Sequence, residues 1–197
     1  MTEKFERNPQ QKESREQESI IVRCFEVEGK EADVRYASQE DYQAVADIFE
    51  DQRRLRAERD HKLPEKPADD EMLEASRRID ERDKFIVLVS EIEDLVCGYV
   101  ELGWYGGDTA FVHAITVLEK YQGKKLGKEL MESCISEAQN RFNVKNIELS
   151  VIAQNKNAVS LYNKLGFKEK EIQKGVDEWD NKPADRVSMV KHLNSGK

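Results

Sequence analysis

A short basic turn in the middle of the chain combines residue types suited to binding a phosphate. Residues Gln122–Gly127 read Q-G-K-K-L-G, and Lys128 follows. Unpaired backbone N–H groups and the helix dipole favour negative charge at a helix N-terminus, and neighbouring lysines add to this effect. The spacing is neither that of a Walker P-loop nor that of the dinucleotide fingerprint. A lysine-rich turn is also an ordinary solvated helix start, so the turn alone is a weak indication of a phosphate site.

The elements around the turn are predicted from their apolar patterns. The run Phe111–Val117 predicts a buried strand, and Lys124–Phe142 predicts a long helix with apolar residues at helical spacing. Cys134 lies on this apolar stripe, so we interpret it as a core residue rather than a nucleophile. A strand over Ile147–Val151 and a second helix within Asn155–Phe167 follow. The second helix has one apolar face and ends at a glycine; the residues are Ala158, Leu161, Tyr162, Leu165 and Gly166.

The rest of the chain adds strands and helices on either side of this segment. Predicted strands cover Ser19–Val27, 32–37, Phe85–Val89, Leu95–Trp104 and Arg186–Leu193, with Glu28–Glu31 turning the first pair into a hairpin. A helix begins at the capping pair Ser38 and Asp41 and runs to about residue 60; another spans about 69–82. Residues Gly175–Asp185 are expected to form a polar loop. The order predicts an α/β fold of α+β type, with a mixed, mostly antiparallel central sheet flanked by helices.

Length and composition predict one domain over residues 19–197, preceded by a disordered tail over 1–18 that is too polar to bury a core. The net charge of -8 argues against a broad nucleic-acid surface. Three cysteines without a C-x-x-C pair argue against a disulfide framework and a structural zinc site, and for a reducing compartment. No apolar run approaches the roughly 20 residues that span a bilayer. We therefore expect a cytoplasmic protein that uses no metal and has no membrane partner.

Two signatures taken together resemble the GNAT superfamily of N-acetyltransferases. In that family a strand ends in a valine, here Val117, and [Q/R]-x-x-G-x-[G/A] opens a long helix, here from Gln122 to Gly127. The second signature, N-x-x-A-x-x-L-Y-x-x-x-G-F, matches Asn155 or Asn157 and the residues that follow to Phe167. The resemblance is specific over about residues 95–168, and the order of elements extends it from Val34 to Leu193. It implies the acyl-CoA N-acyltransferase fold.

The resemblance also implies a cofactor and the residues that bind it. Acetyl-CoA would be the co-substrate, with its pantetheine arm on the backbone near Ile115 to Val117 and beside Asn155. Its pyrophosphate would lie on the turn and helix start, at Gln122, Gly123, Lys124, Lys125, Leu126, Gly127 and Lys128. Tyr162 matches a tyrosine that many members place beside the thioester sulfur, where its phenol could donate a proton to the departing thiolate. The alternative for Tyr162 is an ordinary core aromatic on the helix stripe.

The sequence leaves the family pattern at two positions. Lys125 replaces the central glycine of the pyrophosphate loop. If that position needs no positive φ, a lysine amide donates as well as a glycine amide; if the glycine serves close phosphate approach, affinity falls. Phe111 replaces a glutamate that serves some members as general base. Glu101 and His113 are the remaining candidates for the general base. The alternative for Glu101 is a solvent-facing strand residue, and the alternative for His113 is a hydrogen-bonded core or interface histidine. Strict alternation places His113 on the face of Phe111, Ile115 and Val117.

The predicted reaction is direct acetyl transfer to a primary amine in a ternary complex. The acceptor is an amine on a small molecule, a peptide N-terminus or a lysine. Aromatic and charged side chains expected on the acceptor side would suit an ammonium group, but they could equally form a homodimer surface or be ordinary loop residues; they are Phe49, Arg53, Trp104, Tyr105, Glu178 and Trp179. The alternatives are a non-catalytic acyl-CoA-binding or regulatory module of the same fold and a nucleotide-binding protein that uses the same turn.

Overall fold

The fold is built on a single eight-stranded sheet with the strand order β1-β2-β3-β4-β5-β6-β8-β7. The structure, a computed structural model, describes residues 20–60 and 78–193. Among the described strands only β5 and β6 pair in parallel; the other neighbours are antiparallel. The mixed, mostly antiparallel sheet predicted from the sequence is therefore confirmed. The strands are β1 (Ile21–Val27), β2 (Lys30–Tyr36), β3 (Phe85–Ile92), β4 (Leu95–Trp104), β5 (Thr109–Val117), β6 (Asn146–Ile152), β7 (Lys168–Trp179) and β8 (Lys182–His192).

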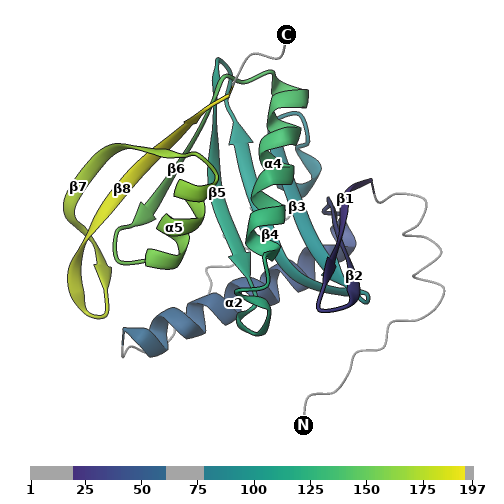
Figure 1. Cartoon of the computed structure of the whole chain (residues 1–197), viewed down its shortest axis with the longest axis horizontal. Helices are drawn as coiled ribbons and strands as arrows, with labels where there is room; N and C mark the ends of the chain where they lie inside the picture. The colour runs from purple at the N-terminus through teal and green to yellow at the C-terminus, as the bar shows by residue number, and fades with distance from the viewer. Residues whose placement is uncertain (1–19, 61–77, 194–197) are drawn as a thin grey trace.

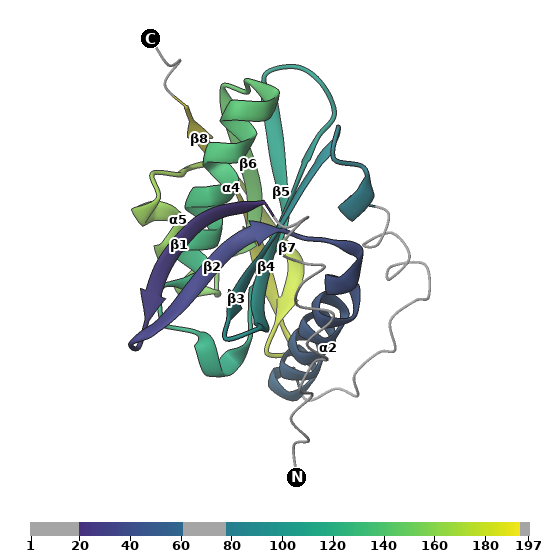
Figure 2. The same ribbon diagram turned by 90° about the vertical axis from the view of Figure 1, so that its right-hand side faces the viewer.

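Helices cover both faces of the sheet. Helices α4 (Leu126–Phe142) and α5 (Lys156–Lys164) lie on one face, and α2 (Tyr42–Arg59) lies on the other (Figures 1 and 2). Alternation along β4 divides the core accordingly, because Val100 and Leu102 pack with α4 whereas Tyr99 packs with α2. Two 3-10 turns, η1 (Gln39–Asp41) and η2 (Glu119–Tyr121), precede α2 and α4. Among the described residues no helix has the length and apolarity that a membrane span requires.

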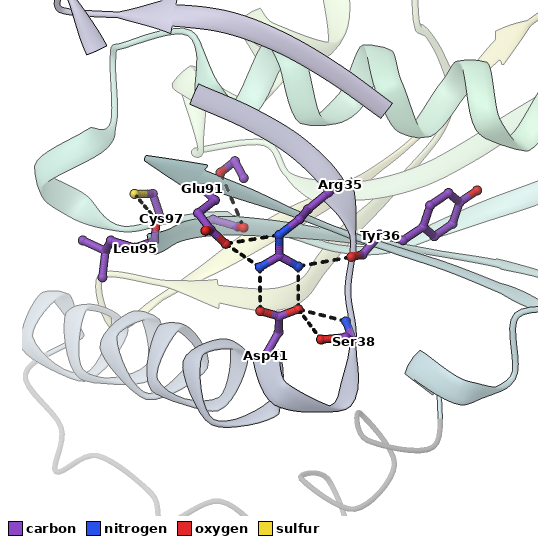
Figure 3. Close-up of polar contacts among 9 residues, drawn as sticks. Arg35, Tyr36, Ser38, Asp41, Glu91, Leu95 and Cys97 are labelled. Carbon is purple, nitrogen blue, oxygen red and sulfur yellow. Dashed lines mark hydrogen bonds and ion pairs between the residues drawn. The ribbon is translucent and has the colours of Figure 1, made fainter. Parts of the chain in front are cut away.

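A buried ion cluster fixes the start of α2 against the sheet (Figure 3). The guanidinium of Arg35 on β2 donates to both carboxylate oxygens of Asp41, at 2.7 and 2.8 Å. Arg35 also donates from Nε to Glu91 on β3 at 3.1 Å. Asp41 in turn accepts from the backbone N–H of Ser38 at 2.8 Å, which confirms the predicted capping pair. Because Arg35 and Asp41 are 5% and 0% exposed, the position of α2 depends on this charged contact as well as on apolar packing.

The observed elements confirm the predicted hairpins β1–β2 and β3–β4 and correct two boundaries. Helix α4 begins at Leu126 rather than Lys124, because the backbone of Lys125 is left-handed with φ 71°. The predicted loop Gly175–Asp185 is wrong, since β7 and β8 continue through it to a turn at Asp180 and Asn181. Almost all of β7 is exposed, so it lacks the apolar alternation by which strands are recognised. The predicted tail over 1–18 and most of the predicted helix over 69–82 fall outside the described residues.

Candidate active site

The sheet opens between β5 and β6. These strands pair only over Thr109–Phe111 and Asn146–Glu148, whereas β5 stays paired with β4 as far as Val117. Strand β6 in turn pairs with β8 along its whole length. From Val112 to Val117 the edge of β5 that faces β6 therefore has no strand partner among the described residues (Figure 1). Such an edge can hydrogen-bond an extended molecule through its backbone groups.

The basic turn lies at the end of this opened strand. Gly123 and Lys125 both have positive φ, 76° and 71°, and α4 starts at the next residue, Leu126. The position of Lys125 therefore does require the left-handed conformation, which carries a cost for a lysine that a glycine would avoid. Leu126 is 1% exposed, so its side chain lies in the core and only its backbone can take part in a site.

Side chains of the turn are partly engaged with the protein itself. Gln122 donates from Nε2 to the carbonyl oxygen of Val117 at 3.1 Å, which ties the turn to the strand end. Lys128 forms an exposed ion pair with Glu132 at 3.2 Å, and Lys124 pairs with Glu28 at 2.8 Å. A Cβ on Gly127 would be 3.6 Å from Leu161 of α5, so the first turn of α4 packs closely on that helix. The backbone N–H groups at the start of α4 thus sit where the opened strand ends.

Helix α5 lies on the same face of the sheet as α4, with Asn155 as its N-cap residue and Tyr162 within the helix. The side-chain oxygen of Asn155 caps the helix by accepting from Ala158 N at 3.2 Å, which leaves the amide N–H groups as its donors. Tyr162 is 6% exposed and its ring lies edge-on to Phe167 at 5.9 Å. Its hydroxyl has no hydrogen-bond partner among the described residues. Burial raises the pKa of Tyr162 to about 12, so the phenol is protonated at neutral pH.

Glu101 lies on the opposite face of the sheet, in the register position across from Ala114 of β5. It is 3% exposed and accepts a hydrogen bond from Arg78 at 2.7 Å, so the interpretation as a solvent-facing strand residue is wrong. A guanidinium neighbour stabilises the charged form of a carboxylate. Sequence reasoning missed Arg78, because no spacing rule links an arginine in one element to a carboxylate 23 residues later.

His113 occupies a β-bulge where β5 begins to leave β6. Glu101 pairs with Ala114 and Leu102 with Val112, so His113 is an extra residue on β5. The bulge interrupts the alternation, and the prediction that His113 shares a face with Ile115 and Val117 is wrong. Those two residues pack into the core beneath α4 and α5. The ring of His113 instead lies 6.4 Å from that of Phe85, whose side chain belongs to the core on the α2 face.

The surroundings of His113 hold its imidazole in place. Its Nε2 is 2.9 Å from the hydroxyl of Tyr105. A Cβ on Gly103 would be 2.5 Å from the same nitrogen, so a glycine is required there for the imidazole to lie over β4. Partial burial, and secondly the charge of Arg78, lower the pKa of His113 below its usual 6.5. The imidazole is therefore neutral at pH 7 and able to accept a proton.

The aromatic residues predicted for an acceptor site divide between the two faces. Tyr105 and Phe111 are 62% and 38% exposed, and their rings lie 6.5 Å apart beside His113. Trp104 is stacked on Phe142 of α4 at 5.1 Å, so its assignment to the acceptor side is wrong. Trp179 lies at the tip of the β7–β8 hairpin, and its ring centroid is 3.8 Å from the guanidinium carbon of Arg59 at the end of α2. Phe49 of α2 packs on Tyr99 at 4.9 Å.

Taken together, the opening between β5 and β6 separates two sets of groups. Backbone N–H groups suited to a phosphate and a protonated phenol belong to the side of α4 and α5. A neutral imidazole and a buried carboxylate lie on the α2 side, close to the point where the strands part. An elongated anionic molecule bound along β5 could carry a reactive group through the sheet to the imidazole.

Comparison with known proteins gives one family and one fold. Residues 36–167 match the model of the acetyltransferase (GNAT) family. An uncharacterised N-acetyltransferase of Methanocaldococcus jannaschii is 32% identical over 100 residues, which cover 48% of this chain and 44% of that protein. An N-alpha-acetyltransferase of Saccharolobus solfataricus is 38% identical over 64 residues, covering 32% and 38%. The chain thus spans less than half the length of these two curated relatives.

Solved structures share the fold over nearly their whole length. A Salmonella typhimurium protein solved with its cofactor acetyl-CoA superposes with a TM-score of 0.69 at 22% identity, covering 84% of this chain and 95% of that one. A ribosomal-protein-alanine N-acetyltransferase of Brucella melitensis gives a TM-score of 0.66 at 26% identity, covering 81% and 99%. The sheet and its flanking helices therefore have the arrangement of GNAT enzymes.

Proposed function

Because the chain belongs to the acetyltransferase (GNAT) family, we propose that it is an N-acetyltransferase that moves the acetyl group of acetyl-CoA directly to a primary amine in a ternary complex. The observation that carries the proposal is the separation of β5 from β6, with phosphate-binding donors at the end of the opened strand. His113, at the point where the strands part, adds a proton acceptor on the other side of the sheet.

The residues present fit the cofactor in charge and in hydrogen-bonding capacity. The free edge of β5 offers backbone donors and acceptors to the amides of the pantetheine arm. The turn offers successive N–H groups and lysine side chains to the pyrophosphate, with Lys125 as a strained member. The amide of Asn155 and the hydroxyl of Tyr162 remain as donors from α5. When bound, acetyl-CoA supplies the activated acetyl group as a thioester.

Two side chains move protons in the proposed reaction. His113 accepts a proton from the acceptor ammonium, directly or through water, and leaves a neutral amine whose nitrogen forms a bond to the acetyl carbon. As the carbon–sulfur bond breaks, Tyr162 donates its proton to the departing thiolate, and the second proton that the nitrogen loses as the amide forms passes through water to restore the phenol. Glu101 is the second candidate for the base, but its ion pair with Arg78 opposes proton uptake. The exposed surface beside Tyr105 and Phe111 would receive the acceptor.

An α-amine is the acceptor that suits His113 best. The pKa of a peptide α-amino group is about 7.7–8.0, whereas that of a lysine side chain is about 10.4. An imidazole with a pKa below 6.5 takes a proton from the former at a much smaller free-energy cost. Names among the relatives agree with this choice, since they include an N-alpha-acetyltransferase and a ribosomal-protein-alanine N-acetyltransferase.

Thermal unfolding with acetyl-CoA, followed by a free-thiol assay on peptides with unblocked N-termini, tests the proposal. We expect stabilisation by acetyl-CoA and release of thiol that depends on the α-amine, with N-terminally blocked peptides as the control. Stabilisation without thiol release across α-amine, lysine and small amine acceptors would instead support a non-catalytic acyl-CoA-binding module. Stabilisation by ATP but not by acetyl-CoA would identify a nucleotide-binding protein and refute the proposal.

Tyr162→Phe tests the proposed acid. Loss of general acid catalysis is worth about 10²–10⁴ in rate, so turnover should fall by at least tens-fold while the Kd for acetyl-CoA barely changes. Phenylalanine keeps the edge-on contact with Phe167, which separates the loss of the hydroxyl from a packing defect. Unchanged turnover would remove Tyr162 from the mechanism.

A further inference from the structure

The β1–β2 hairpin lies almost wholly before residue 36, where the family match begins, yet it packs beneath the basic turn. A small core contains Val27 and Ala32 of the hairpin together with Leu126, the first residue of α4. Tyr121, from the turn before Gln122, packs against the same core. The conformation of the proposed phosphate-binding turn therefore depends on a hairpin outside the family match.

Ion pairs join the hairpin to the same region. Arg23 of β1 contacts Glu129 at 3.0 Å and Glu132 at 2.9 Å, both on α4. The turn of the hairpin consists of Glu28 and Gly29, both with positive φ, 53° and 80°, as in the tight turns that match strand twist. From this turn the carboxylate of Glu28 reaches the ammonium of Lys124 at 2.8 Å.

The contact between Glu28 and Lys124 differs from the other ion pairs because it engages a lysine of the turn itself. The side chain of Lys124 is only 30% exposed, and its ammonium lies 5.5 Å from the ring of Tyr121, so its position is restricted. The side chain of Glu28 is 67% exposed. A phosphate bound at the start of α4 would meet a lysine already paired with a carboxylate, and that carboxylate would repel the phosphate.

We propose that Glu28 sets the affinity of the site for acetyl-CoA by competing with the cofactor's phosphates for Lys124. The inference rests on the proposed function, in which the turn binds the pyrophosphate. Binding replaces the carboxylate of Glu28 with a phosphate as the partner of Lys124, and the released carboxylate stays close to the bound anion. Both effects weaken binding, so the hairpin makes the cofactor easier to release.

Glu28→Gln removes the charge and keeps the size of the side chain. We expect the Kd for acetyl-CoA, measured by isothermal titration calorimetry, to fall about two- to five-fold near 0.1 M salt, the range that an exposed ion pair provides. The gain should shrink at 1 M salt, where the screening length is about 3 Å. Glu26→Gln is the matched control on the same hairpin, because its carboxylate has no hydrogen bond or ion pair with another described residue. That variant should bind like the unmodified chain.

The background Lys124→Gln makes the test specific to the pair. There the gain from Glu28→Gln should be clearly smaller, because only the repulsion between the carboxylate and the bound phosphate remains. An equal gain in both backgrounds, or an equal gain from Glu26→Gln, would show a general charge effect and overturn the inference. An unchanged Kd in Glu28→Gln would also overturn it. Failure of the unmodified chain to bind acetyl-CoA would refute the proposed function instead, so the two failures are distinguishable.

Discussion

Breaking the buried pair between Arg35 and Asp41 should cost much of the stability of the fold. Asp41→Asn keeps the shape of the side chain but removes the charge that two guanidinium N–H groups contact at 2.7 and 2.8 Å. Breaking one partner of a buried ion pair costs about 3–5 kcal/mol, and because Arg35 keeps Glu91 as a charged partner we expect the lower end of this range. For a chain of this length each kcal/mol lowers Tm by roughly 2–4 °C, so Tm should fall by about 6–12 °C.

Adding Arg35→Met to Asp41→Asn measures the free energy of the interaction between the two side chains apart from what each side chain contributes alone. The double variant Arg35→Met/Asp41→Asn leaves no unbalanced guanidinium, so it should be destabilised by clearly less than the sum of the single changes, by at least about 1 kcal/mol. Urea unfolding followed by circular dichroism measures each free energy. Asp108→Asn is the control, because its pair with Lys145 has the same 2.7 Å distance but is 60% exposed, and it should cost under about 1 kcal/mol. Similar costs for Asp41 and Asp108, or additive single changes, would refute the reasoning.

Three further changes address the site. Lys125→Gly should raise the free energy of unfolding by about 1 kcal/mol in urea titrations, because a glycine adopts the left-handed conformation without strain; a loss of stability would contradict this explanation. Gly103→Ala should lower turnover about tenfold or more without changing the Kd for acetyl-CoA, since the added Cβ displaces the imidazole of His113; unchanged turnover would mean that the position of the imidazole is not critical. For the unmodified chain, kcat/KM should fall as the pH drops through the lowered pKa of His113, below 6.5, because an imidazolium cannot accept a proton. The variant His113→Gln should have low activity, and its pH profile should lack this fall at acidic pH. A fall that persists in the variant would point to Glu101 or to the acceptor as the titrating group.

The sequence predicts those parts of the site that depend on local spacing. The turn Gln122–Gly127 and the segment Asn155–Phe167 each lie within one strand-to-helix connection, so their residues are recognisable along the chain. The central strands and α4 could also be predicted from the sequence, because their apolar faces are continuous.

The remaining features depend on contacts between distant segments or on backbone geometry. The pairing of Glu101 with Arg78 requires the tertiary structure. The bulge at His113 arises from the register between β4 and β5, and a single extra residue reverses which face a side chain occupies. The left-handed backbone of Lys125 is also not visible in a sequence where lysine replaces the expected glycine. Strand β7 and the start of β8 were missed because their exposed, polar side chains give no alternating pattern.

The short contact between β5 and β6 has a mechanical consequence for the molecule. Strands β1–β5 and β6–β8 form two sub-sheets whose backbones pair over only three residues on each side. The apolar core beneath α4 and α5 also joins them, and it includes Val34 from one sub-sheet and Ile147 and Met189 from the other. Hydrogen bonds fix register, whereas apolar contacts are non-directional and tolerate small sliding movements. The two sub-sheets can therefore shift slightly against each other without breaking a strand, and a molecule that hydrogen-bonds across the gap would lock their relative position.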